Sequence, residues 1–168
     1  MQHRPLTAVS AAALIGLTLS ACVGTPFAPS AAIPLVASDG AVVGSVTIGR
    51  DGSATIAATR LSPGDHGLHL HEKGRCEVPA FTSAGGHWNP ASKQHGRDNP
   101  AGAHAGDLPN LFVDTTGRGA LRVTFQRGSN DADGSALVIH AKPDDYKTDP
   151  SGASGDRIAC AVLSPPRG

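Results

Sequence analysis

The sequence has 168 residues, of which 14 are Lys or Arg and 14 are Asp or Glu, so the formal net charge at pH 7 is zero. A balanced charge excludes a general nucleic-acid binder, which would carry a basic surface, and 39% hydrophobic against 17% charged residues is too apolar for an intrinsically disordered chain. The length fits one domain. The 21 Gly and 13 Pro predict many turns, and the scarcity of aromatic residues predicts a core of Val, Ile, Leu and Ala.

Residues 1–21 have the pattern of an export signal, with one basic residue, Arg4, no acidic residue, and an apolar run over residues 6–19. The run is shorter than the roughly 20 apolar residues of a membrane-spanning helix, and a buried core helix is the alternative. The tetrad Leu19-Ser20-Ala21-Cys22 resembles the bacterial lipobox, in which the cysteine becomes the lipidated first residue. Residues 22–30 would then be a lipid-anchored tether to the membrane, with simple secretion as the alternative.

Export also decides how the other cysteines are interpreted. If Cys22 carries lipid, Cys76 and Cys160 are an even pair in an oxidising compartment, where disulfides form and persist. We therefore predict a disulfide between Cys76 and Cys160, with two buried free thiols as the alternative. The expected location is the periplasm or the cell surface.

From residue 31 onward, short apolar runs alternate with turn signals, and two Asp-Gly pairs at residues 39–40 and 51–52 favour hairpins. Eight strands are predicted, over residues 31–36, 41–48, 53–59, 67–72, 111–114, 120–125, 136–141 and 157–163. The sequence shows no convincing amphipathic helix. This pattern predicts an all-β domain over residues 31–168, built as an antiparallel sandwich or flattened barrel.

Residues 73–110 have no sustained strand or helix period, and a loop of this length inside a compact domain is usually functional or disordered. Disorder is disfavoured because the loop contains Cys76, Trp88 and three histidines, which suggests that metal ligation orders it. On the strand before the loop, His69 and His71 are two residues apart, so their side chains share one face. Any one of these histidines alone would be interpreted as a packing or surface residue. Together with His140, on the strand predicted at residues 136–141, they make six histidines in two strands and one loop, which indicates a metal site.

Six short motifs carry these residues: GLHLHE at residues 67–72, SAGGHWNP at 83–90, HG at 95–96, HAGDL at 104–108, VIHA at 138–141 and GDRIAC at 155–160. Together and in this order, they resemble copper/zinc superoxide dismutase over roughly residues 31–164. The resemblance implies an eight-stranded antiparallel Greek-key β-sandwich or flattened barrel with long metal-binding loops.

The resemblance also implies two metal sites that share one ligand. Copper would be held by His69, His71, His87 and His140, and zinc by His87, His95, His104 and Asp107. The donor chemistry agrees, because four imidazoles suit copper(II), and a closed set of three histidines and one carboxylate suits structural zinc.

The implied reaction is the disproportionation of superoxide, in which copper cycles between Cu(II) and Cu(I) and zinc has no redox role. His87 would deliver a proton to the second superoxide. Arg157 resembles the family's active-site arginine, a fixed cation that holds a small anion near copper; a solvated surface arginine is the alternative.

Two further residues of the site region are interpreted from the same resemblance. Asp144 corresponds to the carboxylate that accepts hydrogen bonds from His69 and His95, with a turn residue after Pro143 as the alternative. His66 is expected to be structural.

Two features depart from the family pattern: Trp88 stands where many relatives have Phe or Tyr, and the channel loop over residues 142–156 is short. A metal-storage or copper-delivery protein on the same fold is the main rival function, but it would be expected to lack a copper ligand or the arginine, and neither is missing. A structural sandwich would leave the histidines unexplained. The sequence leaves open whether the chain forms a homodimer.

Overall fold

The structure, a computed structural model, describes residues 31–125 and 131–167. The predicted signal peptide, the predicted lipidation site Cys22 and the tether lie outside these residues. Within the described part of the chain, no helix is both long enough and apolar enough to cross a membrane.

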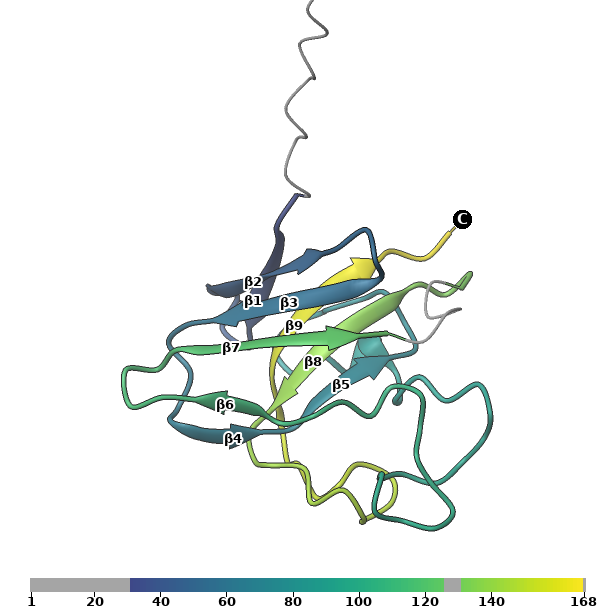
Figure 1. Cartoon of the computed structure of the whole chain (residues 1–168). Coiled ribbons are helices and arrows are strands. Elements are labelled where there is room, and N and C mark those ends of the chain that lie inside the picture. The colour runs from purple at the N-terminus through teal and green to yellow at the C-terminus, as the bar shows by residue number, and fades with distance from the viewer. Residues whose placement is uncertain (1–30, 126–130, 168) are drawn as a thin grey trace, which may run out of the picture.

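Nine strands form a single antiparallel sheet, in the order β4-β6-β7-β3-β2-β1-β9-β8-β5. Their bounds are β1 Ile33–Ala37, β2 Val42–Ile48, β3 Ser53–Ala58, β4 Gly64–His66, β5 Leu68–His71, β6 Leu111–Val113, β7 Gly119–Thr124, β8 Ser135–His140 and β9 Arg157–Ser164. The two end strands of this order, β4 and β5, are separated in the chain only by Gly67. The sheet therefore rolls into a nearly closed, flattened barrel (Figure 1). The all-β antiparallel fold is confirmed.

The strand count differs from the prediction by one. The additional strand, β4, follows Ser62 and Pro63 and begins at Gly64, so its sequence has the composition of a turn. It becomes a strand because it pairs with β6, where His66 lies opposite Leu111. In the described residues the one helical element is a 3₁₀ turn at Thr82–Ala84.

The barrel interior is aliphatic, as the composition predicts. Its buried side chains include Leu35, Val46, Ile56, Leu68, Leu111, Leu137 and Ile139. Strand β3 alternates buried and exposed residues, which is the period of a sheet with one face in water, whereas β5 and β8 are buried along their whole length. Strands β5 and β8 are buried on both faces because loops cover the side that faces away from the core.

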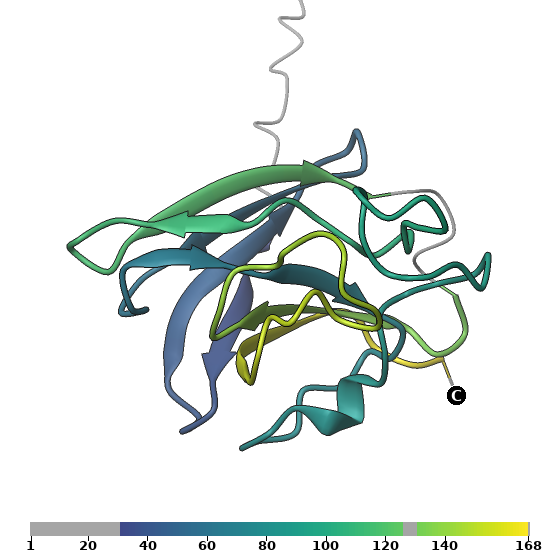
Figure 2. The same ribbon diagram turned by 90° about the horizontal axis from the view of Figure 1, so that it is seen from below.

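Those loops gather at one end of the barrel. In Figure 1 the teal-green loop between β5 and β6 and the yellow-green loop between β8 and β9 both extend below the strands, and in Figure 2 the second of these crosses in front of the barrel. These are the predicted long loop and the channel loop. A site built from both loops therefore lies over β5 and the end of β8.

Part of the long loop is held by backbone hydrogen bonds along β5, so the expectation that metal ligation alone orders the loop is wrong in part. The Leu70 N–H donates to the Gly106 carbonyl at 2.9 Å, and the Leu70 carbonyl accepts from the Trp88 N–H at 2.8 Å. Isolated bridges pair His71 with His87 and His69 with Asp107. The loop thus runs in register with the strand that carries two of the predicted ligands.

The predicted disulfide between Cys76 and Cys160 is confirmed. Cys160 lies on β9 and is fully buried, in a second apolar cluster that also contains Phe81, Ala84, Ala136 and Val138. The disulfide therefore fastens the first part of the long loop to the barrel wall.

Candidate metal centre

Four histidines from two strands and the long loop converge beside the barrel. His69 and His71 project from β5, His140 ends the adjacent β8, and His87 comes from the loop bridged to β5. Each of the four offers one ring nitrogen such that these atoms all lie within 4.8 Å of one another. The rings of His69 and His87 are stacked, with their centroids 3.9 Å apart. This first cluster contains the four predicted copper ligands.

A second group of donors surrounds one oxygen of Asp107. Asp107 Oδ1 lies 3.0 Å from His87 Nδ1, 2.9 Å from His95 Nδ1 and 3.2 Å from His104 Nδ1. His104 Nδ1 and His87 Nδ1 are 3.3 Å apart. Four donors around zinc, with bonds of about 2.0–2.1 Å, would be separated by about 3.3–3.4 Å, so these spacings fit such an ion. The group contains the four predicted zinc ligands.

The second group can be chosen in more than one way. A set with His69 in place of His104 also has its donor atoms within 4.8 Å of one another. However, one ring nitrogen of His69 is hydrogen-bonded to Asp144, and the other belongs to the first cluster. We therefore take His104, whose Nδ1 faces both Asp107 and His87, as the member of the second group.

Hydrogen bonds fix which nitrogen of each ring is protonated. Nε2 of His69 and Nε2 of His95 donate to the two oxygens of Asp144, at 2.9 and 3.0 Å. Nδ1 of His71 donates to the Gly85 carbonyl at 3.0 Å, and Nδ1 of His140 to the Gly155 carbonyl at 3.1 Å. Carbonyl and carboxylate oxygens can only accept, so in the neutral form of each ring the opposite nitrogen carries a lone pair.

These four nitrogens are the buried side-chain atoms without a hydrogen bond in the described residues: His69 Nδ1, His71 Nε2, His95 Nδ1 and His140 Nε2. Of the four, His95 Nδ1 also lies 2.9 Å from Asp107 Oδ1. A buried polar atom without a partner costs free energy, and native proteins leave few of them unexplained. Here all four belong to the two clusters. The sites therefore fit cations that accept nitrogen lone pairs, such as copper and zinc.

The environment keeps the first cluster neutral. Burial lowers the pKa of His69 to about 3 and that of His140 to about 4, and it lowers the pKa of His71 well below its usual value. At neutral pH these rings therefore hold no extra proton that a metal would have to displace.

His95 behaves in the opposite way. Burial opposes its charge, but hydrogen bonds and attraction from the carboxylates of Asp107 and Asp144 prevail and raise its pKa to about 9. Without a metal, His95 is therefore protonated at neutral pH, and a metal that binds its Nδ1 would displace that proton. Burial likewise opposes the charge of both carboxylates, yet the surrounding histidines hold their pKa values far below the usual range. The second cluster thus contains permanently ionised carboxylates, which suit a divalent cation.

A cavity of about 480 Å³ opens onto the first cluster. Its walls include His71, His87, His104, His140 and Arg157, together with Pro150, Ser151 and Gly155 of the channel loop. The cavity gives a small molecule access to the histidines and to one fixed cation.

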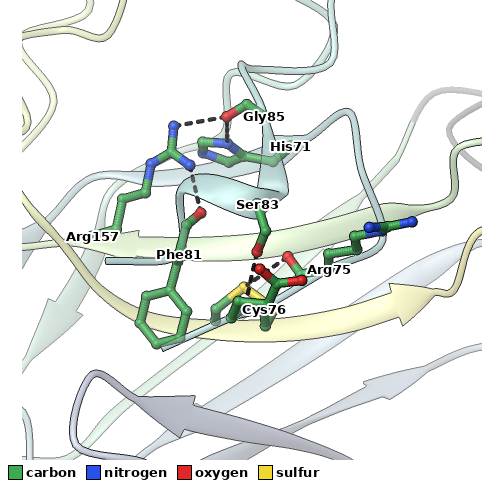
Figure 3. Close-up of a disulfide and its surroundings, with 9 residues drawn as sticks. His71, Arg75, Cys76, Phe81, Ser83, Gly85 and Arg157 are labelled. Atoms are coloured by element: carbon green, nitrogen blue, oxygen red, sulfur yellow. Dashed lines mark hydrogen bonds between the residues drawn. A yellow bond between two sulfur atoms is a disulfide. The ribbon is translucent and has the colours of Figure 1, made fainter. Parts of the chain in front are cut away.

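Arg157 is held in that wall by backbone carbonyls of the long loop (Figure 3). Its Nη1 donates to the Phe81 carbonyl and its Nη2 to the Gly85 carbonyl, both at 2.7 Å. The Gly85 carbonyl is also the acceptor for His71, so the guanidinium and a histidine of the first cluster share one anchor. Burial lowers the pKa of Arg157, but an arginine remains charged in proteins.

The structure places the other singled-out residues as follows. Asp144 is buried and lies between the two clusters, joined to His69 and His95. His66 is buried outside the clusters, with its two ring nitrogens 2.7 Å from the His140 carbonyl and 2.8 Å from the Ser62 carbonyl, which agrees with a structural role. Trp88 packs in the protein interior.

Sequence reasoning missed the residues that surround Asp144 and His95. The side-chain amide of Asn110 binds the backbone of Asp144, the guanidinium of Arg97 stacks on Tyr146, and Asp149 Oδ1 accepts the backbone N–H of His95 at 2.5 Å. No local sequence pattern predicts these contacts, because each joins residues that are 34 to 54 positions apart in the chain.

Comparisons with known proteins agree with this geometry. The chain matches the family described as Copper/zinc superoxide dismutase (SODC) over residues 42–163. It is 41% identical over 142 residues to a Cu-Zn superoxide dismutase from Aquifex aeolicus, covering 77% of this chain and 83% of that protein. It is 38% identical over 170 residues to a Cu-Zn superoxide dismutase from Caulobacter vibrioides, covering 92% and 98%. A crystal structure of a double mutant of a superoxide dismutase-like protein from Bacillus subtilis is similar with a TM-score of 0.74 at 45% identity, covering 82% of this chain and 99% of that one.

Proposed function

The chain belongs to the copper/zinc superoxide dismutase family, and from that premise we propose how its own residues hold the metals and handle superoxide. The reaction converts two superoxide anions and two protons into dioxygen and hydrogen peroxide. The chain is thus an oxidoreductase that uses copper and zinc. Copper supplies the one-electron redox chemistry by alternating between Cu(II) and Cu(I), and zinc supplies charge and structure but no redox step.

The proposed copper ligands are His69, His71, His87 and His140, and the proposed zinc ligands are His87, His95, His104 and Asp107. The observation that carries this assignment is the set of four buried nitrogens without hydrogen-bond partners, all of which belong to these two clusters. Since His87 belongs to the first group and its Nδ1 faces Asp107 and His104 of the second, we assign it to both metals.

His87 is also the proposed proton carrier. Its Nδ1 is occupied by contacts with Asp107 and His104, whereas the ring lines the open cavity. The remaining nitrogen, Nε2, is therefore the atom that would hold copper, and when it does not hold copper we assign it to take up a proton and release it to the second superoxide. The other proton of hydrogen peroxide would come from water at the open cavity.

Arg157 is proposed to bind the superoxide anion. Two of its N–H groups are used by the carbonyls of Phe81 and Gly85, and these contacts hold the charge in the cavity wall without neutralising it. A fixed cation in a cavity wall attracts a small anion and orients it.

Replacing Arg157 with alanine is expected to lower superoxide turnover by about 10-fold or more, because a charged cleft raises association rates by about 10- to 1,000-fold, while copper content stays unchanged. The measurement is superoxide decay together with elemental analysis of the same sample. Arg122→Ala is the matched control, because Arg122 is an exposed arginine on β7 paired with Asp51, and its loss is expected to leave turnover unchanged. Loss of copper from the Arg157 variant would show that this residue supports the ligands instead.

For location, we propose that the chain is exported and that residues 1–21 are removed, leaving lipid on Cys22, a tether over residues 22–30 and the enzyme domain over residues 31–168. The disulfide supports an oxidising compartment. Mass spectrometry of the mature N-terminus is expected to find an acylated Cys22. A mature protein that begins elsewhere with an unmodified residue would contradict the anchor while leaving export possible.

A further inference from the structure

We propose that Tyr146 is a positioning residue that orients Asp144, the carboxylate shared by His69 and His95, and thereby sets both metal sites. The proposal rests on the metal assignments made above. It adds an outer layer of residues, which acts on the ligands through Asp144 and has no direct contact with the ions.

Asp144 is held from two sides. Its carboxylate accepts Nε2–H of His69 on Oδ2, and on Oδ1 it accepts both Nε2–H of His95 and the backbone N–H of Tyr146, the last at 2.7 Å. The side-chain amide of Asn110 binds its backbone twice, accepting the Asp144 N–H at 2.9 Å and donating to the Asp144 carbonyl at 3.0 Å. The direction of the carboxylate therefore depends on where Tyr146 and Asn110 lie.

Tyr146 fixes Asn110 and the segment next to His95 at the same time. Its phenol oxygen accepts the backbone N–H of Asn110 at 2.8 Å, and its carbonyl accepts the backbone N–H of Asp98 at 3.0 Å. The guanidinium carbon of Arg97 stands 3.7 Å from the centre of the Tyr146 ring, a cation–π contact. One side chain and its backbone thus join the channel loop to the residues just after His95 and to Asn110, which follows Asp107.

The backbone of Tyr146 supports a role beyond making a turn. Its φ is 61°, in the left-handed region, where a bulky aromatic residue is uncommon and persists only when the surroundings hold it there. A simple change of direction would favour Gly or Asn at this position. Gly96 lets the backbones of the two loops approach closely at this point, because a Cβ there would lie 2.1 Å from the Tyr146 carbonyl oxygen.

Tyr146→Phe isolates the hydrogen bond between the phenol oxygen and the backbone N–H of Asn110. Phenylalanine can keep the ring, the stacked guanidinium and the backbone bonds, but it has no oxygen to accept the N–H of Asn110. In the full chain we expect the zinc affinity, measured by competition with a chromophoric chelator, to fall by about 3- to 10-fold, less than the 10–100-fold typical of a direct partner of a ligand. The electron paramagnetic resonance spectrum of bound copper(II) is expected to shift as well, because Asp144 also orients His69.

Two comparisons separate this role from general loop stability. In an Asp144→Ala background, Tyr146→Phe is expected to cause no further loss of zinc affinity, because the route through the carboxylate is already broken. Phe112→Leu is the matched control: Phe112 is an exposed aromatic on β6, 64% exposed, and its change is expected to leave zinc affinity and the copper spectrum as in the wild type.

An equal loss of zinc affinity with and without Asp144 would overturn the proposal, as would wild-type zinc affinity and an unshifted copper spectrum in Tyr146→Phe. In those cases the wild-type chain would still bind both metals, and the proposed function would stand. A wild-type chain that bound neither metal would instead overturn the metal assignments themselves.

Discussion

Replacing His140 with alanine is expected to lower superoxide turnover by about 100-fold or more, since even the outer partners of a metal ligand are typically worth 10–100-fold and His140 is proposed as a ligand itself. Its Nε2 is one of the four buried nitrogens without a partner, and its Nδ1 is fixed by the Gly155 carbonyl. Alanine removes the proposed ligand nitrogen and the bond that orients it, and it opens a space beside His69 and His71. The measurement is superoxide decay by the copper-loaded protein before and after the change.

The same variant should distinguish the two metals. His140 does not belong to the second cluster, so the zinc content of His140→Ala is expected to equal that of the wild type. Ile139→Val, a neighbouring change on β8 that removes one buried methylene-sized group, serves as the control for altered packing, and it is expected to keep activity. Equal activity of His140→Ala and the wild type would remove the catalytic assignment of the first cluster.

Loss of the disulfide is expected to produce the largest change in stability. The cysteines are 84 residues apart, and the chain-entropy model gives about 4.5 kcal/mol for a loop of that length. The total free energy of unfolding of a domain is about 5–15 kcal/mol, so the disulfide accounts for a large share of the stability. The double variant Cys76→Ala/Cys160→Ala is expected to have a melting temperature lower by about 10–15 °C. Alanine is chosen because Cys160 is buried among apolar side chains.

Reduction provides the control for this prediction. Wild-type protein unfolded in the presence of a thiol reductant is expected to match the double variant, because both lack the same covalent link. If the double variant melts within about 3 °C of the oxidised wild type, the cross-link does not restrict the unfolded chain as the entropy model requires.

Much of the fold could be predicted because its signals are local. Two Asp-Gly pairs mark the β1–β2 and β2–β3 hairpins, and in each the aspartate accepts a backbone N–H two residues on while the glycine has positive φ. The Leu-His-Leu-His alternation of β5 likewise places its two histidines on one face. Strand β4 was missed because pairing with a distant strand, rather than its own composition, makes it extended.

The candidate site likewise has residues that the sequence could predict and residues that it could not. Its histidines could be proposed because metal ligands must be of a few residue types and because the motifs resemble a known family. The residues that hold these ligands in place could not be predicted, because the pairing of Asn110 with Asp144 and of Tyr146 with Arg97 depends on how two irregular loops meet. Contacts of that kind follow from the assembled tertiary structure and leave no period in the sequence.

The hydrogen bonds that align the long loop with β5 also protect the sheet. A strand at the margin of a sheet normally offers unpaired amides and carbonyls to any other extended chain, which is a route to aggregation. In this molecule the outward-facing groups of Leu68 and Leu70 are already taken by the segments around Trp88 and Gly106–Leu108. A substitution that loosened those segments would therefore lower the solubility of the protein as well as disturb the geometry of the ligands. Precipitation during expression would then be the first sign of such a defect.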